Sequence, residues 1–134
     1  MDTRDKDEFA EGFVPGSFSI TGNKSFSTWA GWFLDYKEPF ILIANDNKID
    51  ELTRKLMRVG LDNLKGYIEN IDDLGLDKGK INMVSIEELK DKYLNNPAYQ
   101  VVDVRGASEF KSGHIEGVEN IFVGRTAEPC PRSR

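Results

Sequence analysis

Apolar and polar positions along the chain predict strands that alternate with helices. The run FILIA (40–44) is continuously apolar, which is typical of a parallel strand buried on both faces. After the polar loop ANDNK (44–48), apolar residues recur at helical spacing: Ile49, Leu52, Leu56 and Met57. Gly60 is a natural end for that helix. The order strand, loop and amphipathic helix predicts an α/β unit.

Further elements flank this unit on both sides. Aromatic residues at three- and four-residue spacings predict a helix within 23–36, and LDNLKGYIENI (61–71) predicts another short strand. Ser85 and Glu88 form the capping-box pattern S-x-x-E, which opens a helix that Pro97 ends. The apolar side of this helix consists of Ile86, Leu89, Tyr93 and Leu94. YQVVDV (99–104) then predicts a β-branched strand.

Two segments of the chain repeat each other. Residues 2–20 align without gaps to residues 103–121 and share D-x-R, E-F, two glycines and a final isoleucine. The first copy is followed by the α/β elements, whereas the second copy is preceded by a helix and a strand. We therefore expect the back part of one domain at 1–73, a linker at 74–82, the front part of a second domain at 83–123 and a disordered tail at 124–134.

Composition excludes several classes of function. A net charge of −5 argues against a nucleic-acid-binding surface, and no apolar run reaches the length of a membrane span, so we expect a cytoplasmic chain. Cys130 is the only cysteine, which excludes an internal disulfide and a cysteine-rich zinc site. His114 is the only histidine, so neither a metal nor another cofactor is expected.

The repeated pattern resembles that of rhodanese-homology domains. The second copy carries it as Asp103, Arg105, Glu109, Phe110, Gly113, His114, Ile115, Gly117, Asn120 and Ile121. The first copy carries Asp2, Arg4, Glu8, Phe9, Gly12 and Gly16, with Phe13 and Val14 in place of His-Ile. The resemblance implies an α/β fold, a rhodanese-like parallel sheet flanked by helices.

A narrower resemblance is to the two tandem rhodanese domains of bacterial metallo-β-lactamase–rhodanese fusion proteins. Those proteins combine a persulfide dioxygenase with a sulfurtransferase, and their metal-binding domain has no counterpart here. On this reading the chain is a truncated remnant of such a sulfur-metabolising fusion.

The resemblance also implies where the chemistry of the family would take place. A rhodanese transfers sulfur through a cysteine at the end of a buried strand, in a loop whose backbone amides stabilise the persulfide anion. Alignment places Ala44 at that position, or Asn45 after a one-residue slip, and neither forms a persulfide. The rest of the loop is Asp46, Asn47 and Lys48. The acidic residues Asp46 and Asp50 would repel anionic thiosulfate.

No catalytic residue is therefore predicted, and the other motif residues are interpreted as structural. By family likeness, Asp103 and Arg105 form a polar pair at a strand end, as do Asp2 and Arg4, while Glu109 and His114 belong to the same structural motif. The aromatic residues Trp29, Trp32 and Phe33 could form a ligand cage, but their spacing on one helix favours packing.

We interpret the chain as a catalytically inactive rhodanese-like module. The alternative is a sulfurtransferase that acts on thiosulfate or a persulfide, for which Cys130 would have to supply the sulfur nucleophile. A phosphatase of related fold is a more distant alternative, since it too requires the missing loop cysteine.

The two partial domains also suggest how a complete sheet could form. We expect the strand 99–104 and the helix 85–94 to fill the place before Asp2, either within one chain or in a homodimer by half-domain exchange. No nucleic-acid or membrane partner is expected.

Overall fold

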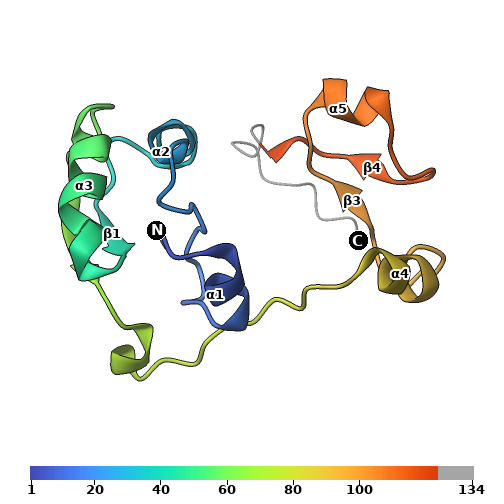
Figure 1. Cartoon of the computed structure of the whole chain (residues 1–134), viewed down its shortest axis with the longest axis horizontal. Coiled ribbons are helices and arrows are strands. Elements are labelled where there is room, and N and C mark those ends of the chain that lie inside the picture. The colour runs from blue at the N-terminus through green and yellow to red at the C-terminus, as the bar shows by residue number, and fades with distance from the viewer. Residues whose placement is uncertain (124–134) are drawn as a thin grey trace. The chain divides into compact units, whose positions relative to one another are not determined.

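The computed structural model describes residues 1–123, which fall into two compact units. Unit 1 is Met1–Met83, and unit 2 begins at Val84. Figure 1 labels α1 to α5, β1, β3 and β4, and each unit is described by itself. Within residues 1–123, no helix combines the length and apolar character needed to cross a membrane.

Unit 1 is built on a small parallel sheet. β1 (Phe40–Ile43) pairs in parallel with β2 (Leu64–Ile68). At the other edge of β1, Asp2 forms parallel bridges to both Ile43 and Ser19. The order across the sheet is therefore Ser19, Asp2, β1 and β2, and it confirms the predicted α/β class for this unit.

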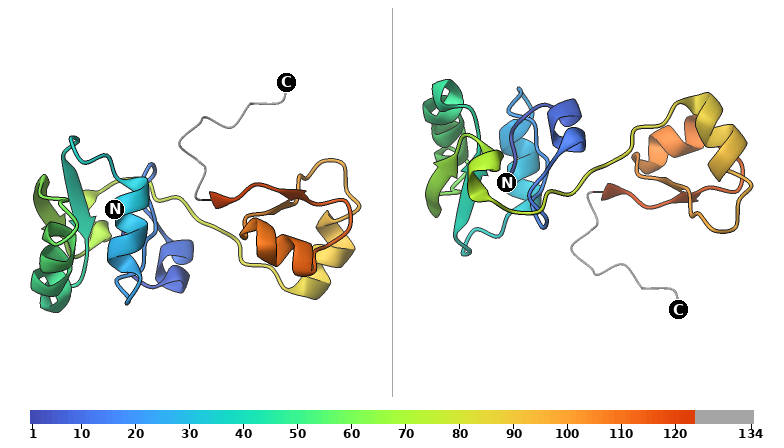
Figure 2. Two further views of the ribbon diagram at one scale, coloured as in Figure 1. Left: turned by 90° about the horizontal axis from the view of Figure 1, so that it is seen from above. Right: turned by 90° about the horizontal axis from the view of Figure 1, so that it is seen from below.

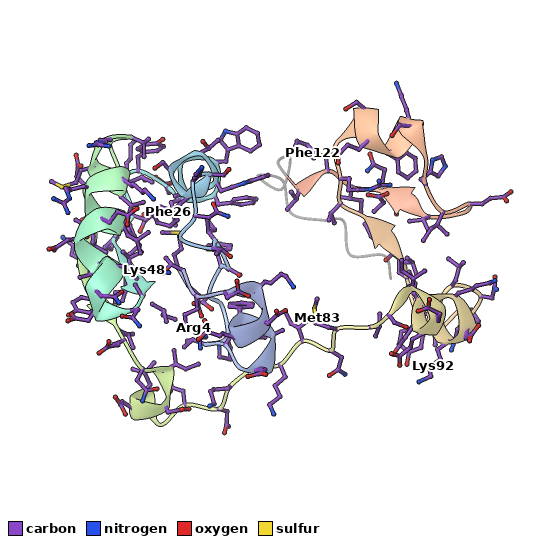
Figure 3. All side chains as sticks on the ribbon, in the orientation of Figure 1. Arg4, Phe26, Lys48, Met83, Lys92 and Phe122 are labelled. Atoms are coloured by element: carbon purple, nitrogen blue, oxygen red, sulfur yellow. The ribbon has the colours of Figure 1, made fainter. Side chains whose placement is uncertain are left out.

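One apolar cluster holds the sheet and two helices of unit 1 together. α2 (Phe26–Phe33) and α3 (Asp46–Met57) both contribute side chains to it. Its buried members are Ile20, Phe26, Ala30, Leu42, Ala44, Leu52, Leu56 and Leu61. Phe26 is fully buried at the start of α2 (Figure 3), and Figure 2 shows both helices beside the sheet in two further views. The predicted helix over Ile49 to Met57 is confirmed, and Gly60 follows it with a positive φ of 81°.

Two expectations about burial in unit 1 are wrong. Ile41, in a strand expected to be buried on both faces, is 47% exposed, and Met57, expected on the inner side of α3, is 59% exposed. The apolar cluster covers the sheet face that carries Leu42 and Ala44, so the alternating position of Ile41 lies on the opposite face. Met57 is the last residue of α3, where the helix gives way to the turn that ends at Gly60.

The segment expected to be a linker is tied to unit 1 by hydrogen bonds. The 3₁₀ turn η1 (Ile71–Leu74) ends at the first residue of this segment, which was expected over 74–82. Phe13 and Gly79 then exchange two backbone hydrogen bonds of 3.0 and 2.9 Å, and Ile81 N–H donates to the Ala10 carbonyl at 2.9 Å. We call residues 78–81 the strap, because they lie against α1 (Lys6–Glu11) and the residues that follow it.

Unit 2 contains a second, smaller parallel sheet. β3 (Val102–Asp103) pairs in parallel with β4 (Glu119–Asn120), and α5 (Ala107–Ser112) lies between them in the chain. α4 (Ile86–Glu88) continues into the π-helical turn η2 (Leu89–Tyr93). The strand expected over 99–104 is thus only two residues long, and it pairs with β4 inside its own unit.

The capping signal of the helix in unit 2 is confirmed, but its apolar side is only partly covered. The Ser85 hydroxyl accepts a hydrogen bond of 3.1 Å from Glu88 N–H, as the S-x-x-E pattern predicts. Leu89, Tyr93 and Leu94 are half-buried. Ile86 is 80% exposed, so its expected place on a buried side is wrong. Ile86 is the first residue of α4, whereas the half-buried residues begin at Leu89 on the apolar side.

Candidate functional site

The end of β1 is the position at which the family likeness places a reactive cysteine. Ala44 stands there with only 1% of its surface exposed. Its N–H donates a hydrogen bond of 3.0 Å to the carbonyl of Ile68, and its side chain belongs to the apolar cluster of unit 1. A side chain at this position points into the core, where a substrate has no access.

The chain leaves β1 and enters α3 with a single residue between Ala44 and the helix. Asn45 is the N-cap, and its side-chain oxygen accepts a hydrogen bond of 3.2 Å from Asn47 N–H. Its carbonyl accepts from Lys48 N–H at 2.9 Å (Figure 3 labels Lys48). The Glu69 carboxylate, which follows β2, accepts from Asp46 N–H at 3.2 Å. The amides of Asp46 and Asn47, at the start of α3, are thus bonded to the chain's own oxygens.

Negative charge gathers at the same end of the sheet. Tyr67 Oη donates a short hydrogen bond to the Asp46 carboxylate. This bond, together with the charge of Asp46 and then of Glu69 and Asp50, raises the pKa of Tyr67 above its ordinary value of 10.0. An anion such as thiosulfate would approach three carboxylates here, with Lys48 as the one basic residue of the loop.

The first D-x-R motif forms a closed hydrogen-bond network. Arg4 Nε donates to both Asp2 carboxylate oxygens at 3.0 and 3.2 Å, and its Nη2 donates to Asp2 at 2.7 Å and to the Gly12 carbonyl at 2.8 Å. Asp2 is fully buried, and its hydrogen bond raises the pKa of Arg4. Figure 3 labels Arg4 beside α1. The guanidinium therefore joins the strand end to the end of α1.

The second D-x-R motif repeats this network bond for bond. Arg105 Nε donates to the Asp103 oxygens at 3.1 and 3.0 Å, and Nη2 donates to Asp103 at 2.6 Å and to the Gly113 carbonyl at 2.9 Å. The bond lowers the pKa of Asp103 and raises that of Arg105. Both copies thus use their arginine to tie a strand end to the glycine after a short helix.

The repeat extends to the helices and rings that follow each motif. Glu8 accepts from Asp5 N–H at 3.2 Å, and Glu109 accepts from Gly106 N–H at the same distance. The Phe9 and Phe13 rings stack with centroids 4.7 Å apart, and in unit 2 Phe110 stacks on His114 at 3.8 Å. His114 Nδ1 also lies 2.9 Å from the carbonyl of Phe110. His114 therefore occupies the place of Phe13 and is bonded to its own helix.

The aromatic residues of α2 pack on one another. Trp29 contacts Trp32 edge-on at a centroid distance of 5.2 Å and stacks with Phe33 at 6.1 Å. Trp29 and Phe33 border the apolar cluster, whereas Trp32 is 59% exposed. Trp29 therefore packs against both of the other rings along one helix, as their spacing predicts.

The part of the chain that the structure describes contains no group of three or more metal-ligating side chains. Cys130 and the tail 124–134, expected to be disordered, lie outside the described residues. The structure therefore brings together Ala44 to Lys48 at one strand end, and it brings each D-x-R pair together within its own unit.

Comparison with known proteins agrees with the sequence motif. Residues 85–133 match the family model described as a Rhodanese-like domain. This match covers unit 2, which carries the complete G-H-I-x-G-x-x-N-I string. The comparison with curated proteins found no match to this chain.

Solved structures extend the similarity in fold. The crystal structure of the Rhodanese_3-like domain of the Alr3790 protein from Anabaena has a TM-score of 0.55 and 13% identity, over 63% of this chain and 94% of that chain. A second crystal structure of the Alr3790 protein has a TM-score of 0.54 and 14% identity, over 66% of this chain and 80% of that one. The rhodanese-like fold expected from the motif is thereby confirmed.

Sequence reasoning missed two residues at the end of the sheet. Glu69 and Tyr67 both come from the end of β2, and they bond to the first residue of α3. Parallel neighbouring strands bring their carboxyl ends to one edge of a sheet, so pairing of the two predicted strands would have placed both residues beside the loop. The hydrogen bonds that Glu69 and Tyr67 make with Asp46 could not be predicted from the sequence pattern.

Proposed function

We propose that this chain is a catalytically inactive rhodanese-like module. One observation carries the proposal: the position that a sulfur nucleophile would occupy holds Ala44, which is buried in the core. Alanine has no group that accepts a sulfane sulfur atom. The neighbouring residue Asn45 uses its side chain to cap α3 and cannot form a persulfide either.

The geometry after β1 supports the same proposal. Stabilising a thiolate or persulfide requires several backbone amides directed at the sulfur. Here the amides of Asp46 and Asn47 are bonded to Glu69 and Asn45, and α3 begins directly after Asn45. The acidic edge formed with Asp50 opposes the approach of anionic sulfur donors. The site would need both a nucleophile and a different loop in order to act.

The narrower likeness to metallo-β-lactamase–rhodanese fusions belongs to this proposal as well. In that setting, the module would serve as a structural or binding part beside a sulfur-handling enzyme. The resemblance of both repeat copies to tandem rhodanese domains supports it.

A thiosulfate–cyanide assay tests the proposed lack of activity. Purified full-length chain is incubated with thiosulfate and cyanide, and thiocyanate is measured as its ferric complex. We expect a rate equal to that of buffer. The control is Cys130→Ser, because Cys130 is the only cysteine in the sequence. Thiocyanate production by the unmodified chain that disappears in Cys130→Ser would establish the alternative, a sulfurtransferase.

A further inference from the structure

The outer edge of β3 in unit 2 is covered by no strand within the described residues. Between residues 84 and 123, the sheet of unit 2 consists of β3 and β4, in that order. Asp103 uses its carbonyl on the β4 side, where it accepts from Ile121 N–H at 2.9 Å. Successive residues of a strand direct their backbone groups to alternate edges. The carbonyl of Val102 and the N–H of Val104 therefore face the other edge of β3. Val104 is 54% exposed.

Unit 1 shows what covers this edge when a strand is present. Thr3 is the counterpart of Val104, and it is only 8% exposed. Its N–H donates to the Ile43 carbonyl at 2.9 Å, and its hydroxyl donates to the same carbonyl at 2.8 Å. Ile43 N–H donates to the Met1 carbonyl at 2.8 Å, and Met1 is the counterpart of Val102. The occupant in unit 1 is therefore an apolar strand, β1, which runs parallel to the D-x-R strand.

The surroundings of the free edge in unit 2 suit the same kind of occupant. A hollow of about 530 Å³ borders it. Its apolar lining includes Leu89, Val101, Val102, Val104, Ile115 and Val118. The charges that reach it, those of Asp103 and Arg105, are bonded to each other. A neutral, apolar segment therefore matches both the backbone edge and the hollow.

We propose that the edge formed by Val102 and Val104 binds an extended apolar segment of a partner polypeptide as an added parallel strand. The segment would place one carbonyl level with Val104 N–H and one N–H level with the Val102 carbonyl, as Ile43 does in unit 1. Backbone bonds would fix its direction, and apolar side chains would fill the hollow. This inference deepens the proposed function of a binding module by naming the chemistry of its partner.

A peptide copied from β1 is the probe. Fluorescently labelled EPFILIAN (38–45), with solubilising lysines added at its end, is titrated with the full-length chain, and anisotropy is measured. The matched control peptide carries an N-methyl group at Ile43, which removes the donor for the Val102 carbonyl. We expect saturable binding of the first peptide and about tenfold weaker binding of the second.

Two variants at the exposed position 104 locate the binding on the protein. Val104→Pro removes the edge N–H and is expected to weaken binding by about tenfold or more. Val104→Thr retains the N–H and adds the hydroxyl that Thr3 uses in unit 1, so it is expected to bind as tightly as the unmodified chain or more tightly. Slower hydrogen exchange at the Val104 amide on addition of the peptide would support the proposal independently of any substitution.

Several outcomes would overturn this inference without touching the proposed lack of catalysis, which the thiocyanate assay tests separately. The first is absence of binding to the unmodified chain, and the second is equal binding to Val104→Pro. A third is that the unmodified chain forms a dimer, which the Val104→Pro substitution dissociates but the added peptide does not. The occupant of the edge would then be a second copy of this chain.

Discussion

The two D-x-R motifs have the same bonds in different surroundings. The Arg4 Nη2 to Asp2 distance is 2.7 Å and that from Arg105 to Asp103 is 2.6 Å, and each arginine also reaches the carbonyl of a glycine eight residues on. The side chains of Arg4 and Asp2 are 18% and 0% exposed, whereas those of Arg105 and Asp103 are 46% and 12% exposed. The local sequence is sufficient for the ion-pair geometry, and the covering strand β1 determines the burial.

This difference changes what each arginine contributes. A buried carboxylate depends on its partner, because water cannot replace the lost charge and hydrogen bonds. The more exposed pair of unit 2 contributes less, since water reaches Arg105 and competes for its bonds. Unequal responses to equivalent substitutions in the two units would therefore be consistent with this difference in burial.

The largest expected effect comes from removing the arginine of the buried pair. Arg4→Ala leaves the Asp2 carboxylate without its charged partner, and we expect unit 1 to lose about 3 kcal/mol of unfolding free energy. Trp29 and Trp32 are the only tryptophans and both lie in unit 1, so tryptophan fluorescence in a urea titration reports on that unit alone. The matched variant Arg105→Ala should leave this transition unchanged, so its own effect is read in unit 2 from hydrogen exchange of the Ile121 amide, where we expect a smaller loss of stability. Equal loss in both variants would contradict the comparison.

A second prediction concerns the strap, for which unit 2 has no counterpart within residues 84–123. A Cβ atom at Gly79 would lie 2.3 Å from Cζ of Phe13, whose ring is stacked on Phe9. Gly79→Ala is expected to destabilise unit 1 by about 1–3 kcal/mol in the same urea titration. The control is Gly66→Ala, because a Cβ there meets nothing within 4 Å. If both variants unfold at the same urea concentration, the strap adds nothing to the stability of unit 1.

Asn120 gives unit 2 two hydrogen bonds that unit 1 lacks at the equivalent Ser19. Its side-chain amide donates to the carbonyls of Asp103 and Arg105 at 3.0 and 2.9 Å. Asn120→Ser removes this bridge, and we expect the unfolding free energy of unit 2 to fall by about 1 kcal/mol. The measurement is hydrogen exchange of the Ile121 amide by NMR, which should become about fivefold faster. The exposed substitution Asn95→Ser serves as the control and should leave this rate unchanged.

The smallest expected effect is a pH dependence of the more exposed pair, Asp103 and Arg105. The hydrogen bond from Arg105 lowers the pKa of Asp103 below its ordinary value of 3.8. The resulting stabilisation of unit 2 is fully present above pH 3.8 and is lost as the pH falls through the lowered pKa of the folded state. Carboxyl NMR should place the Asp103 titration below 3.8, and Arg105→Gln should return it towards that value. A titration that the substitution does not move would assign the shift to another cause.

The sequence predicted the elements whose signals are local. Gly60 ends α3 with a positive φ, Ser85 caps α4, and the ungapped repeat corresponds to two matching networks. Each of these depends on residues a few positions apart in the chain.

Features set by distant parts of the chain were not predicted. Ile41 and Ile86 have the pattern of buried residues but are exposed, because no described segment packs over them. Glu69 and Tyr67 contact α3 only because β1 and β2 pair in parallel, and a pattern of single strands does not specify that register. The filling of the place before Asp2 by strand 99–104 and helix 85–94, within a chain or between two chains, stays a prediction. Light scattering and deletion of residues from 84 onward would test it.

The one-residue connection between Ala44 and α3 limits how sulfur chemistry could be engineered into this scaffold. A thiol introduced by Ala44→Cys would sit among leucines, where burial raises the pKa of a thiol and keeps it protonated. The same substitution at Asn45 would gain a more accessible thiol but would remove the cap on which the helix start depends. A reactive thiol at this site would therefore require inserted residues that lengthen the connection. A single point mutation would not be sufficient to produce it.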